Sequence, residues 1–308
     1  MRKELLAALM LGASVFAIPA MAADLRIGLQ EDPDVLDPDQ SRTFVGRIVY
    51  ASLCDKLVDI TPGLEIIPQL ATGWTWSEDG LTLTMDLRAG ATFHDGTPFD
   101  AEAVKANIDR SQNMPESRRK SEVKSIASVT VTGPLQVQFT LAAPDATLLA
   151  QFADRAGMML SPTAFTAAGL DFGAAPVCSG EYKFVERIAQ DRIVLETFAD
   201  YYNADEYSYD RVIFLPIPDT TVRLANLQSG DLDMLKRLPP SDLAAVKGDT
   251  NLVAAEEKSF GYQAIYVNIN NGDRAKNPLG TDMRVRQALS YTIDRDVVNQ
   301  VVHHTNCQ

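Results

Sequence analysis

The sequence has few histidines and cysteines, and it lacks the short motifs on which many enzymes and nucleotide-binding proteins depend. Among its 308 residues there are three histidines and three cysteines. The dinucleotide pattern GxGxxG, the phosphate-binding loop, the zinc pattern HExxH, the nucleophile pattern GxSxG and the redox pattern CxxC are all missing. A histidine base or a cysteine metal site would therefore have few residues to draw on. We expect no catalytic residue, no metal site and no cofactor.

One histidine, His94, lies in the turn formed by residues 93–98, between a predicted hairpin and a predicted helix. No nucleophile in a recognisable motif accompanies it. We expect His94 to be a hydrogen-bonded turn residue rather than a catalytic base.

Basic residues are fewer than acidic residues in this sequence. There are 28 Lys and Arg against 41 Asp and Glu, which gives a net charge of -13. Nucleic-acid binding needs a basic surface, and adsorption to an anionic membrane face needs positive charge. We expect neither, and the acidic balance is typical of a soluble protein. The length allows one large or two ordinary domains.

Long hydrophobic runs that approach the ~20 residues of a membrane span are also missing. Residues 1–22 are typical of a secretory signal peptide, with two basic residues, an apolar stretch at 5–19 and an A-x-A pattern at 20–22. We expect cleavage before Ala23 and export to an oxidising compartment, a bacterial periplasm.

The first part of the chain has the period-two alternation and the Gly-containing turns of β-hairpins. Strands are predicted at residues 25–29, with one hairpin at 74–87 and a second at 129–141. Helices are predicted at 44–57 and, capped by Asp100, at 100–111.

From about Gly180 the pattern changes. Paired strands are predicted at 182–187 and 193–198. A βαβ unit is predicted next, which implies parallel strand pairing. It consists of a strand at 211–217, a helix that Asp219 or Thr220 caps and Gly230 closes, and a strand at 232–235. Further strands are predicted at 252–255 and 264–269, and a last helix, capped by Asp282, at 283–302.

Five stretches are specific enough to compare with known families. The longest is residues 80–104, GLTLTMDLRAGATFHDGTPFDAEAV. The others are LDP at 36–38, PQLATGW at 68–74, VCSGEYKFV at 177–185 and VRQALSYTIDR at 285–295. Together, and in this order, they resemble the bacterial extracellular solute-binding proteins of family 5. These are the peptide-, glutathione- and nickel-type binding proteins of ABC importers.

The resemblance implies an α/β fold of the type II (cluster C) periplasmic binding protein kind, with a composite lobe and an inserted α+β domain. The implied parts are a signal peptide at 1–22, lobe I at 23–48 and 170–270, an inserted domain II at 49–169 and the start of an incomplete lobe III at 271–308. Family members continue further, so a C-terminal truncation is expected. Glu181 stands where the family usually has proline.

The implied function is binding without catalysis. The chain would be the periplasmic solute-binding component of an ABC importer, a monomer that binds a peptide or similar small polar solute and delivers it to the membrane permease subunits. By family position and side-chain type, the predicted ligand-binding residues are Ser41, Arg42, Thr43, Phe44, Tyr262 and Tyr266. Arg42 could pair with a ligand carboxylate, and the two tyrosines could stack on a ligand. A surface arginine and packing tyrosines are the alternatives.

The implied domain boundaries bring Cys54 and Cys178 near the same crossover between lobe I and domain II. Because nearby thiols join in an oxidising compartment, we expect a disulfide between them, with Cys307 left over. The alternative is two buried cysteines that never meet.

Two other interpretations stay open. The chain could be a non-functional or regulatory fragment of such a protein, because lobe III, which encloses the ligand in the family, is incomplete. It could also be a periplasmic hydrolase on an α/β scaffold, although the lack of a nucleophile motif counts against this.

Overall fold

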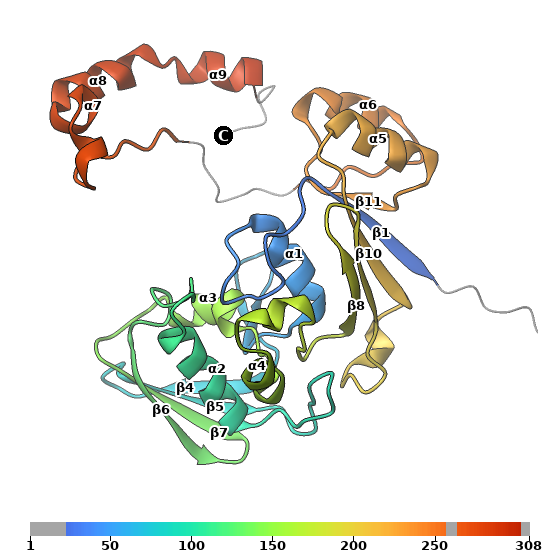
Figure 1. The fold of residues 1–308 in the computed structure, drawn as a ribbon, viewed down its shortest axis with the longest axis vertical. Helices are drawn as coiled ribbons and strands as arrows, with labels where there is room; N and C mark the ends of the chain where they lie inside the picture. The colour runs from blue at the N-terminus through green and yellow to red at the C-terminus, as the bar shows by residue number, and fades with distance from the viewer. Residues whose placement is uncertain (1–22, 257–263, 303–308) are drawn as a thin grey trace, which may run out of the picture. The chain divides into compact units, whose positions relative to one another are not determined.

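The structure is a computed structural model that describes residues 23–256 and 264–302, and Figure 1 shows their course along the chain. The signal peptide predicted at 1–22 lies outside the described residues. Contacts divide the chain into two units. One contains residues up to Leu25 together with Pro33–Phe214, and the other contains Arg26–Asp32 together with the chain from Leu215 onward. The domain boundaries implied by the family pattern remain a prediction.

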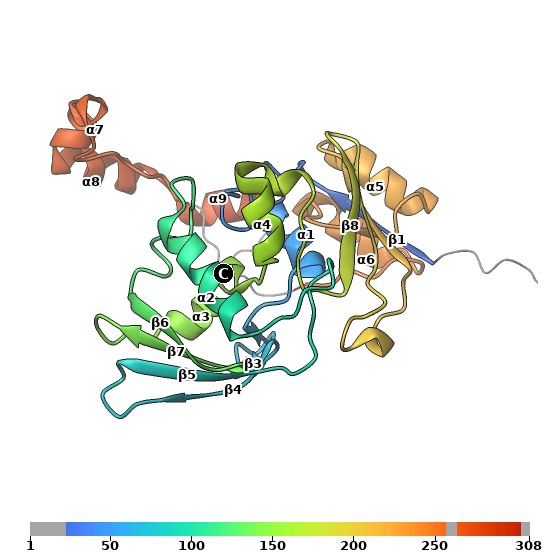
Figure 2. The same cartoon turned by 60° about the horizontal axis from the view of Figure 1, so that its bottom comes forward.

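The first unit contains a four-stranded antiparallel sheet with helix α2 packed against one face, as Figure 2 shows. The strand order is β4-β5-β7-β6. The strands are β4 (Ala71–Trp76), β5 (Thr82–Leu87), β6 (Ile126–Gly133) and β7 (Gln136–Leu141). Both predicted hairpins are confirmed.

Alternating side chains bury one face of this sheet. Leu83 and Met85 of β5 lie opposite Phe139 and Val137 of β7, and all four side chains are fully buried. Apolar pairs directly across two strands stabilise a sheet by roughly 0.2–1 kcal/mol each. The buried members of this hydrophobic core all come from the stretch Leu57–Met159.

Helix α2 (Ala101–Asn113) begins where the sequence predicts because Asp100 caps it. The Asp100 carboxylate accepts a hydrogen bond from the Ala103 amide at 2.9 Å, and such a cap contributes about 1 kcal/mol. Val104 and Ile108 lie one turn apart and are fully buried. The predicted cap is confirmed, and these two side chains supply the face that joins the core.

Helix α1 (Phe44–Leu53) ends earlier than the sequence predicts, because Cys54 already has an extended backbone with φ -128° and ψ 114°. The following residues pair with another segment instead of continuing the helix. The Leu57 amide donates to the Gly157 carbonyl at 2.9 Å, and the Met159 amide donates to the Asp55 carbonyl at 2.9 Å. Periodicity alone does not separate a helix from a short buried extended run, which explains the error.

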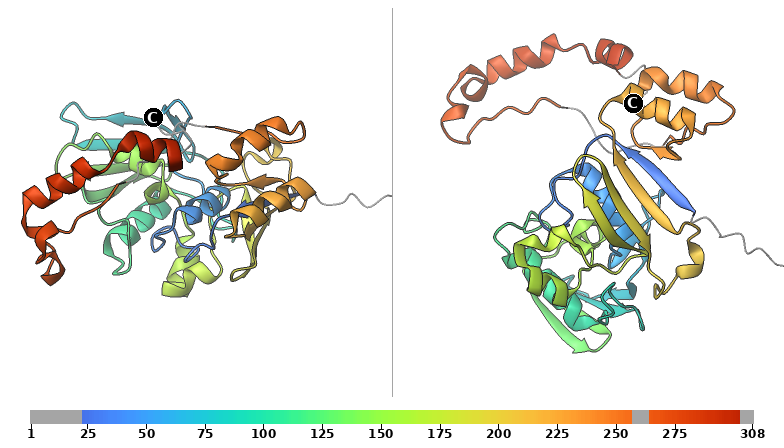
Figure 3. Two further views of the ribbon diagram at one scale, coloured as in Figure 1. Left: turned by 90° about the horizontal axis from the view of Figure 1, so that it is seen from above. Right: turned by 45° about the vertical axis from the view of Figure 1, so that its right-hand side comes forward.

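A second sheet has the strand order β11-β1-β10-β9-β8. β8–β9 and β9–β10 are antiparallel pairs, and β1–β11 is a parallel pair. Figure 3 shows β8, β9 and β10 side by side, and α1 contacts β8. Five of the predicted strands are confirmed in this sheet, namely β1 (Asp24–Leu29), β8 (Tyr182–Ile188), β9 (Arg192–Thr197), β10 (Arg211–Pro216) and β11 (Met234–Leu235).

Helix α5 (Thr220–Ser229) follows β10, as predicted for the βαβ unit. Asp219 is its cap, since its carboxylate accepts hydrogen bonds from the amides of Thr221 and Val222 at 2.9 and 3.0 Å. Gly230 ends the helix with φ 84°, in the left-handed region that favours glycine.

The pairing implied for the βαβ unit is wrong in one respect, because the partner of β11 is β1. The register places Ile27 opposite Met234. Beside it, the Arg26 Nη2 atom lies 2.9 Å from the Asp233 Oδ1 atom. A strand from the start of the chain therefore occupies the position next to β11 that the local pattern assigned to β10.

The strands predicted at 252–255 and 264–269 are wrong, since neither range contains a strand in the structure. Val253 is 93% exposed and Ile265 is 65% exposed. A strand needs a neighbour for its ladder of hydrogen bonds, and these two ranges have no such neighbour among the described residues.

The helix predicted at 283–302 is two helices, α8 (Met283–Thr292) and α9 (Arg295–Val302). Asp282 caps the first, as predicted, because the Arg284 amide donates to its carboxylate at 2.9 Å. Asp294 divides them, since its carboxylate accepts hydrogen bonds from the amides of Asp296 and Val297 at 3.1 and 3.0 Å and starts a new helix. Neither helix has a fully buried residue.

The remaining elements are short. The strands β2 (Val58–Ile60) and β3 (Ile66–Pro68) form an antiparallel pair. The short helices are α3 (Leu148–Phe152), α4 (Pro162–Ala168), α6 (Leu243–Gly248) and α7 (Pro278–Thr281). The 3-10 helices are η1 (Arg155–Gly157), η2 (Gly169–Ala174), η3 (Ala204–Glu206), η4 (Pro240–Asp242) and η5 (Asp273–Ala275).

Candidate functional site

The predicted ligand-binding segment, residues 41–44, lies between β1 and α1 and is fixed by Asp34. The Asp34 carboxylate accepts hydrogen bonds from the Ser41 hydroxyl at 2.8 Å, the Arg42 amide at 2.9 Å and the Thr43 hydroxyl at 3.0 Å. Burial acts to raise the pKa of Asp34, but these hydrogen bonds outweigh it and hold the pKa below its usual value. One carboxylate therefore holds three consecutive residues just before α1.

The four residues of this segment differ in exposure. Ser41 is fully buried, Thr43 is half-buried, and Arg42 and Phe44 are exposed. The Arg47 guanidinium lies over the Phe44 ring, 5.4 Å from its centroid. Arg42 and Phe44 are thus the members of the segment that present side chains to solvent, and their role in ligand binding stays a prediction.

Two arginines that are distant in the sequence contact the backbone of the same segment. The Arg119 Nη2 atom donates to the Ser41 carbonyl at 3.3 Å. The Arg155 Nη1 atom donates to the carbonyls of Ser41 and Thr43, at 3.4 Å in each case. Sequence reasoning missed both arginines, because Arg119 follows α2 in a loop, Arg155 begins η1, and no local motif marks either position.

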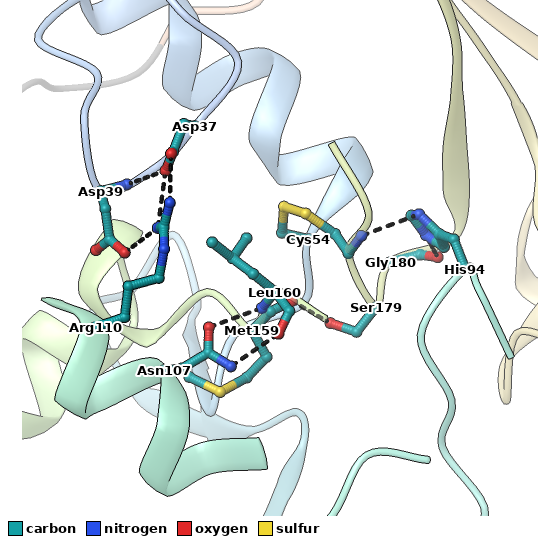
Figure 4. Close-up of a disulfide and its surroundings, with 11 residues drawn as sticks. Asp37, Asp39, Cys54, His94, Asn107, Arg110, Met159, Leu160, Ser179 and Gly180 are labelled. Carbon is teal, nitrogen blue, oxygen red and sulfur yellow. Dashed lines mark hydrogen bonds and ion pairs between the residues drawn. A yellow bond between two sulfur atoms is a disulfide. The ribbon is translucent and has the colours of Figure 1, made fainter. Parts of the chain in front are cut away.

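A buried ionic cluster holds the loop that leads to the segment, as Figure 4 shows. Arg110 of α2 pairs with Asp37 at 2.7 Å and also with Asp39, and all three side chains are at most 8% exposed. The Ser111 hydroxyl donates to the Asp39 carboxylate at 2.6 Å. Burial works against the charge of Arg110, but its hydrogen bonds with Asp37 outweigh burial and raise its pKa. Asp37 belongs to the LDP stretch, so this motif serves to anchor the loop.

The structure joins Cys54 and Cys178 by a disulfide, shown in Figure 4. It lies at the point where the chain leaves α1 and where it returns before β8. The Gly180 amide donates to the Leu53 carbonyl at 2.8 Å. A Cβ atom on Gly180 would lie 2.6 Å from the backbone carbonyl of Leu53, so only glycine permits this close approach.

His94 is hydrogen-bonded within the same crossover, as the sequence predicts for a turn residue. Its Nδ1 atom accepts from the Cys178 amide at 3.3 Å, and its Nε2 atom lies 3.0 Å from the Gly180 carbonyl (Figure 4). Its ring also makes an edge contact with Phe198 at 5.1 Å. Burial lowers the pKa of His94 to about 4. Both ring nitrogens are therefore used to hold the crossover.

Two acids lie near the disulfide, and of these Asp55 is fully buried and Glu181 is half-buried. The Asp55 carboxylate accepts hydrogen bonds from the Tyr202 hydroxyl at 2.6 Å, the Tyr201 hydroxyl at 3.1 Å and the Gln69 amide group at 3.0 Å. Burial raises the pKa of Asp55 to about 6, although these tyrosine hydrogen bonds act in the opposite direction. Burial also raises the pKa of Glu181, to about 8, and the negative charge of Asp55 adds to this shift.

The structure describes one of the two tyrosines predicted to contact a ligand. Tyr262 lies outside the described residues. Tyr266 is 80% exposed.

A surface depression of about 320 Å³ lies beside α1. Arg47, Asp154 and Met158 contribute to its lining, and no residue of the predicted segment does.

The part of the chain that the structure describes contains neither a metal-ligand cluster nor a helix able to span a membrane. Over residues 23–256 and 264–302, no group of three or more His, Cys, Asp or Glu side chains is placed to hold a metal ion. Over the same ranges, no helix is both long and apolar enough to cross a membrane.

Comparison with curated proteins gives relatives named as binding proteins. The chain is 32% identical over 298 residues to the glutathione-binding protein GsiB of Salmonella paratyphi A, and 31% identical over 292 residues to that of Pectobacterium atrosepticum. These matches cover 96% and 94% of the chain. The chain spans only 57% and 55% of the length of these relatives.

Solved structures support the fold. NikZ from Campylobacter jejuni in complex with Ni(L-His) matches with a TM-score of 0.79 and 27% identity, over 92% of this chain and 55% of that one. A dipeptide-binding protein from Pseudoalteromonas in complex with Met-Leu matches with a TM-score of 0.82 and 24% identity, over 92% and 59%. The predicted α/β fold of the type II periplasmic binding protein kind is confirmed.

Residues 65–306 match the family described as bacterial extracellular solute-binding proteins, family 5 Middle. This range covers most of the chain and includes four of the five stretches on which the resemblance rested. The chain belongs to the bacterial extracellular solute-binding proteins of family 5.

Proposed function

We propose that the chain is the solute-binding component of an ABC importer, and that it binds a peptide or similar small polar solute reversibly and without catalysis. The family match over residues 65–306 carries the proposal. Relatives named as glutathione-binding proteins support a peptide-like solute. Delivery to permease subunits of the inner membrane, by a monomer that closes about a hinge, is part of the same proposal.

The proposed ligand contacts start from the segment that Asp34 fixes. A binding residue must be held in place while its side chain stays accessible, and Arg42 meets both conditions. Its planar guanidinium suits a ligand carboxylate. Tyr266 is exposed and offers an aromatic face for stacking.

The compartment is a further part of the proposal. Export by cleavage before Ala23 would place the protein in a bacterial periplasm, and the disulfide between Cys54 and Cys178 supports an oxidising compartment. Exported material should begin at Ala23 on N-terminal sequencing. Material that still begins at Met1 would contradict this part.

The binding function is tested by calorimetry on the purified chain. Reduced glutathione, trialanine and a dipeptide such as Met-Leu are titrated separately, and saturable binding of at least one is expected. The same mixtures are then analysed for hydrolysis products, which a binding protein should not form. Turnover above background would favour a hydrolase. If none of these solutes binds, the proposal that the chain binds a peptide or similar solute is contradicted.

A further inference from the structure

A surface depression of about 590 Å³ lies between two loops of the first unit. One loop, residues 121–125, leads from α2 into β6, and the other, residues 142–147, leads from β7 to α3. The Ala142 amide donates to the Ser125 carbonyl at 2.8 Å and joins the two loops. Small-molecule sites typically have volumes of about 300–1,000 Å³. The residues that line this depression are separate from the segment 41–44 and from the depression beside α1.

The lining contains a carboxylate oxygen without a donor. The Glu122 Oε1 atom accepts a hydrogen bond from Arg119. The Glu122 Oε2 atom is buried and has no hydrogen-bond partner among the described residues. A buried acceptor without a donor destabilises the folded protein, and such groups are rare in native structures. A ligand group that donates a hydrogen bond to this oxygen would satisfy it.

Gln151 of α3 adds unused hydrogen-bonding groups to the same lining. Its side chain is half-buried and makes no hydrogen bond within the part of the chain that the structure describes. A side-chain amide has both donor hydrogens and an acceptor oxygen. The Thr147 hydroxyl donates to the Asp145 carboxylate at 2.6 Å, which leaves the hydroxyl oxygen able to accept. Donors and acceptors are therefore both available to a ligand.

Both carboxylates of the lining have positive charge nearby. Glu122 pairs with Arg119, and its negative charge also acts on Arg155. The positive charge of Lys124 acts on Asp145. A cationic ligand would be repelled by the positive side chains, and an anionic ligand by the two carboxylates. The ligand expected here is therefore uncharged.

We propose that this depression binds a saccharide. An uncharged sugar supplies several hydroxyl groups, each of which can donate one hydrogen bond and accept others. One hydroxyl would donate to the Glu122 Oε2 atom, and others would bond with Lys124 and Gln151. Residues 142–144, which are Ala, Ala and Pro, supply apolar surface against which the C–H groups of a sugar ring can pack. The inference does not depend on the proposed function, because the lining residues are separate from the segment predicted to bind the solute.

The test uses the full chain, with cellobiose, maltose and chitobiose as probes. Saturation-transfer difference NMR detects binding, and a titration gives the dissociation constant. Saturable binding of at least one disaccharide is expected. Neither putrescine, a dication, nor succinate, a dianion, should displace the bound disaccharide. Failure of all three disaccharides to bind would overturn the inference, and displacement by either charged compound would overturn the uncharged class of ligand.

Two variants place the bound sugar at this depression. Glu122→Gln replaces one carboxylate oxygen with an amide nitrogen and should weaken binding about 10- to 100-fold, as the loss of a hydrogen bond to a charged group implies. Gln151→Ala should weaken binding about 2- to 10-fold, because the hydrogen bonds that it removes are neutral. Glu116→Gln is the matched control, since it makes the first change at an exposed residue outside the lining, and it should bind as wild type does. Unchanged affinity in both Glu122→Gln and Gln151→Ala would overturn the inference.

Thermal unfolding excludes a loss of structure as the cause of weaker binding. Gln151→Ala removes no hydrogen bond between described residues, so its melting temperature without ligand should match that of wild type. Weaker sugar binding at an unchanged melting temperature supports a direct contact. If binding weakens only together with a marked fall in melting temperature, Gln151 has a structural role and the proposed contact is wrong.

Competition separates this site from the one proposed for the solute. A saturating disaccharide should leave the titration with reduced glutathione or Met-Leu unchanged. If sugar and peptide exclude each other, the sugar occupies the solute site, and this inference fails while the proposed function stands. If no peptide binds but the sugar does, the proposed function fails for peptides and this inference stands.

Discussion

At the scale of single residues, Glu181 combines an unusual position with an unusual environment. It directly follows Gly180 at the crossover, and its half-buried carboxyl group lies near Asp55. Burial raises its pKa from 4.5 to about 8. An acid whose pKa is higher in the folded state than in the unfolded state favours folding only while it is protonated. The stability that this group contributes is therefore lost as the pH rises from about 4.5 to about 8.

Glu181→Gln should remove this pH dependence. Between pH 6 and 8 the wild type should lose stability, and the variant should lose less, because glutamine does not ionise. Asp55, with a pKa of about 6, is half ionised at the lower end of this window, and it is present in both proteins, so the difference between their curves reports on Glu181. Urea unfolding at several pH values measures the difference, and exposed Glu78→Gln is the control. Parallel curves for wild type and Glu181→Gln would contradict the raised pKa described for Glu181.

Gly180 gives a second test at this scale. Gly180→Ala should destabilise the fold by about 1–3 kcal/mol or more, since its Cβ atom would lie 2.6 Å from backbone atoms that cannot move aside easily. Gly73→Ala is the control, because no atom lies within 4 Å of the position of its Cβ atom. Denaturant unfolding of both variants is the measurement. Equal stabilities would show that the crossover adjusts to the extra methyl group.

At the scale of the elements, the buried cluster of Asp37, Asp39 and Arg110 joins the loop after β1 to α2. Arg110→Met should destabilise the protein by about 3–5 kcal/mol, because it leaves two buried carboxylates without their partner. Lys105→Met, on the same helix, removes an exposed i,i+4 pair and should cost only about 0.3–0.5 kcal/mol. The free energy of unfolding of both variants tests this. Equal costs would mean that the cluster does not hold the loop to α2.

Most elements could be predicted because their signals are local. The cap Asp100, the alternation of β5 and the cap Asp219 all act within a few residues of the structure that they specify. Two of the errors arose where distant segments determine the structure. The end of α1 is set by pairing with residues 157–159, and the partner of β11 comes from the start of the chain.

The residues of the candidate site also fall into two groups, those that the family pattern predicts and those that only the fold brings together. Residues 41–44 could be proposed from family position, and Cys54 and Cys178 from the domain boundaries that the family implies. Arg119 and Arg155 could not, because only the folded chain brings them to the carbonyls of that segment. A charged side chain in a loop has no periodicity, and the backbone segment that it contacts is known only from the folded structure.

At the scale of the whole molecule, the disulfide closes a loop with a sequence separation of 124 residues. In the chain-entropy model a loop of this length stabilises the fold by about 5 kcal/mol, and measured losses are about 2–5 kcal/mol. Cys54→Ser combined with Cys178→Ser should show a loss of this size in urea. The comparison is made in a Cys307→Ser background, so that no other thiol can form a disulfide. A negligible loss would mean that the hydrogen bonds of His94 and Gly180 already hold the crossover.

The pairing of β1 with β11 has a consequence for the order in which the chain folds. The ion pair between Arg26 and Asp233 joins residues 207 positions apart. At a synthesis rate of ~5–20 residues per second, β1 waits roughly 10–40 s before its parallel partner has been made. The core from Leu57 to Met159 needs no residue made that late, so it can form first. The first strand of the protein is therefore among the last to be paired, and until then it is an unprotected edge that a chaperone or another chain can bind.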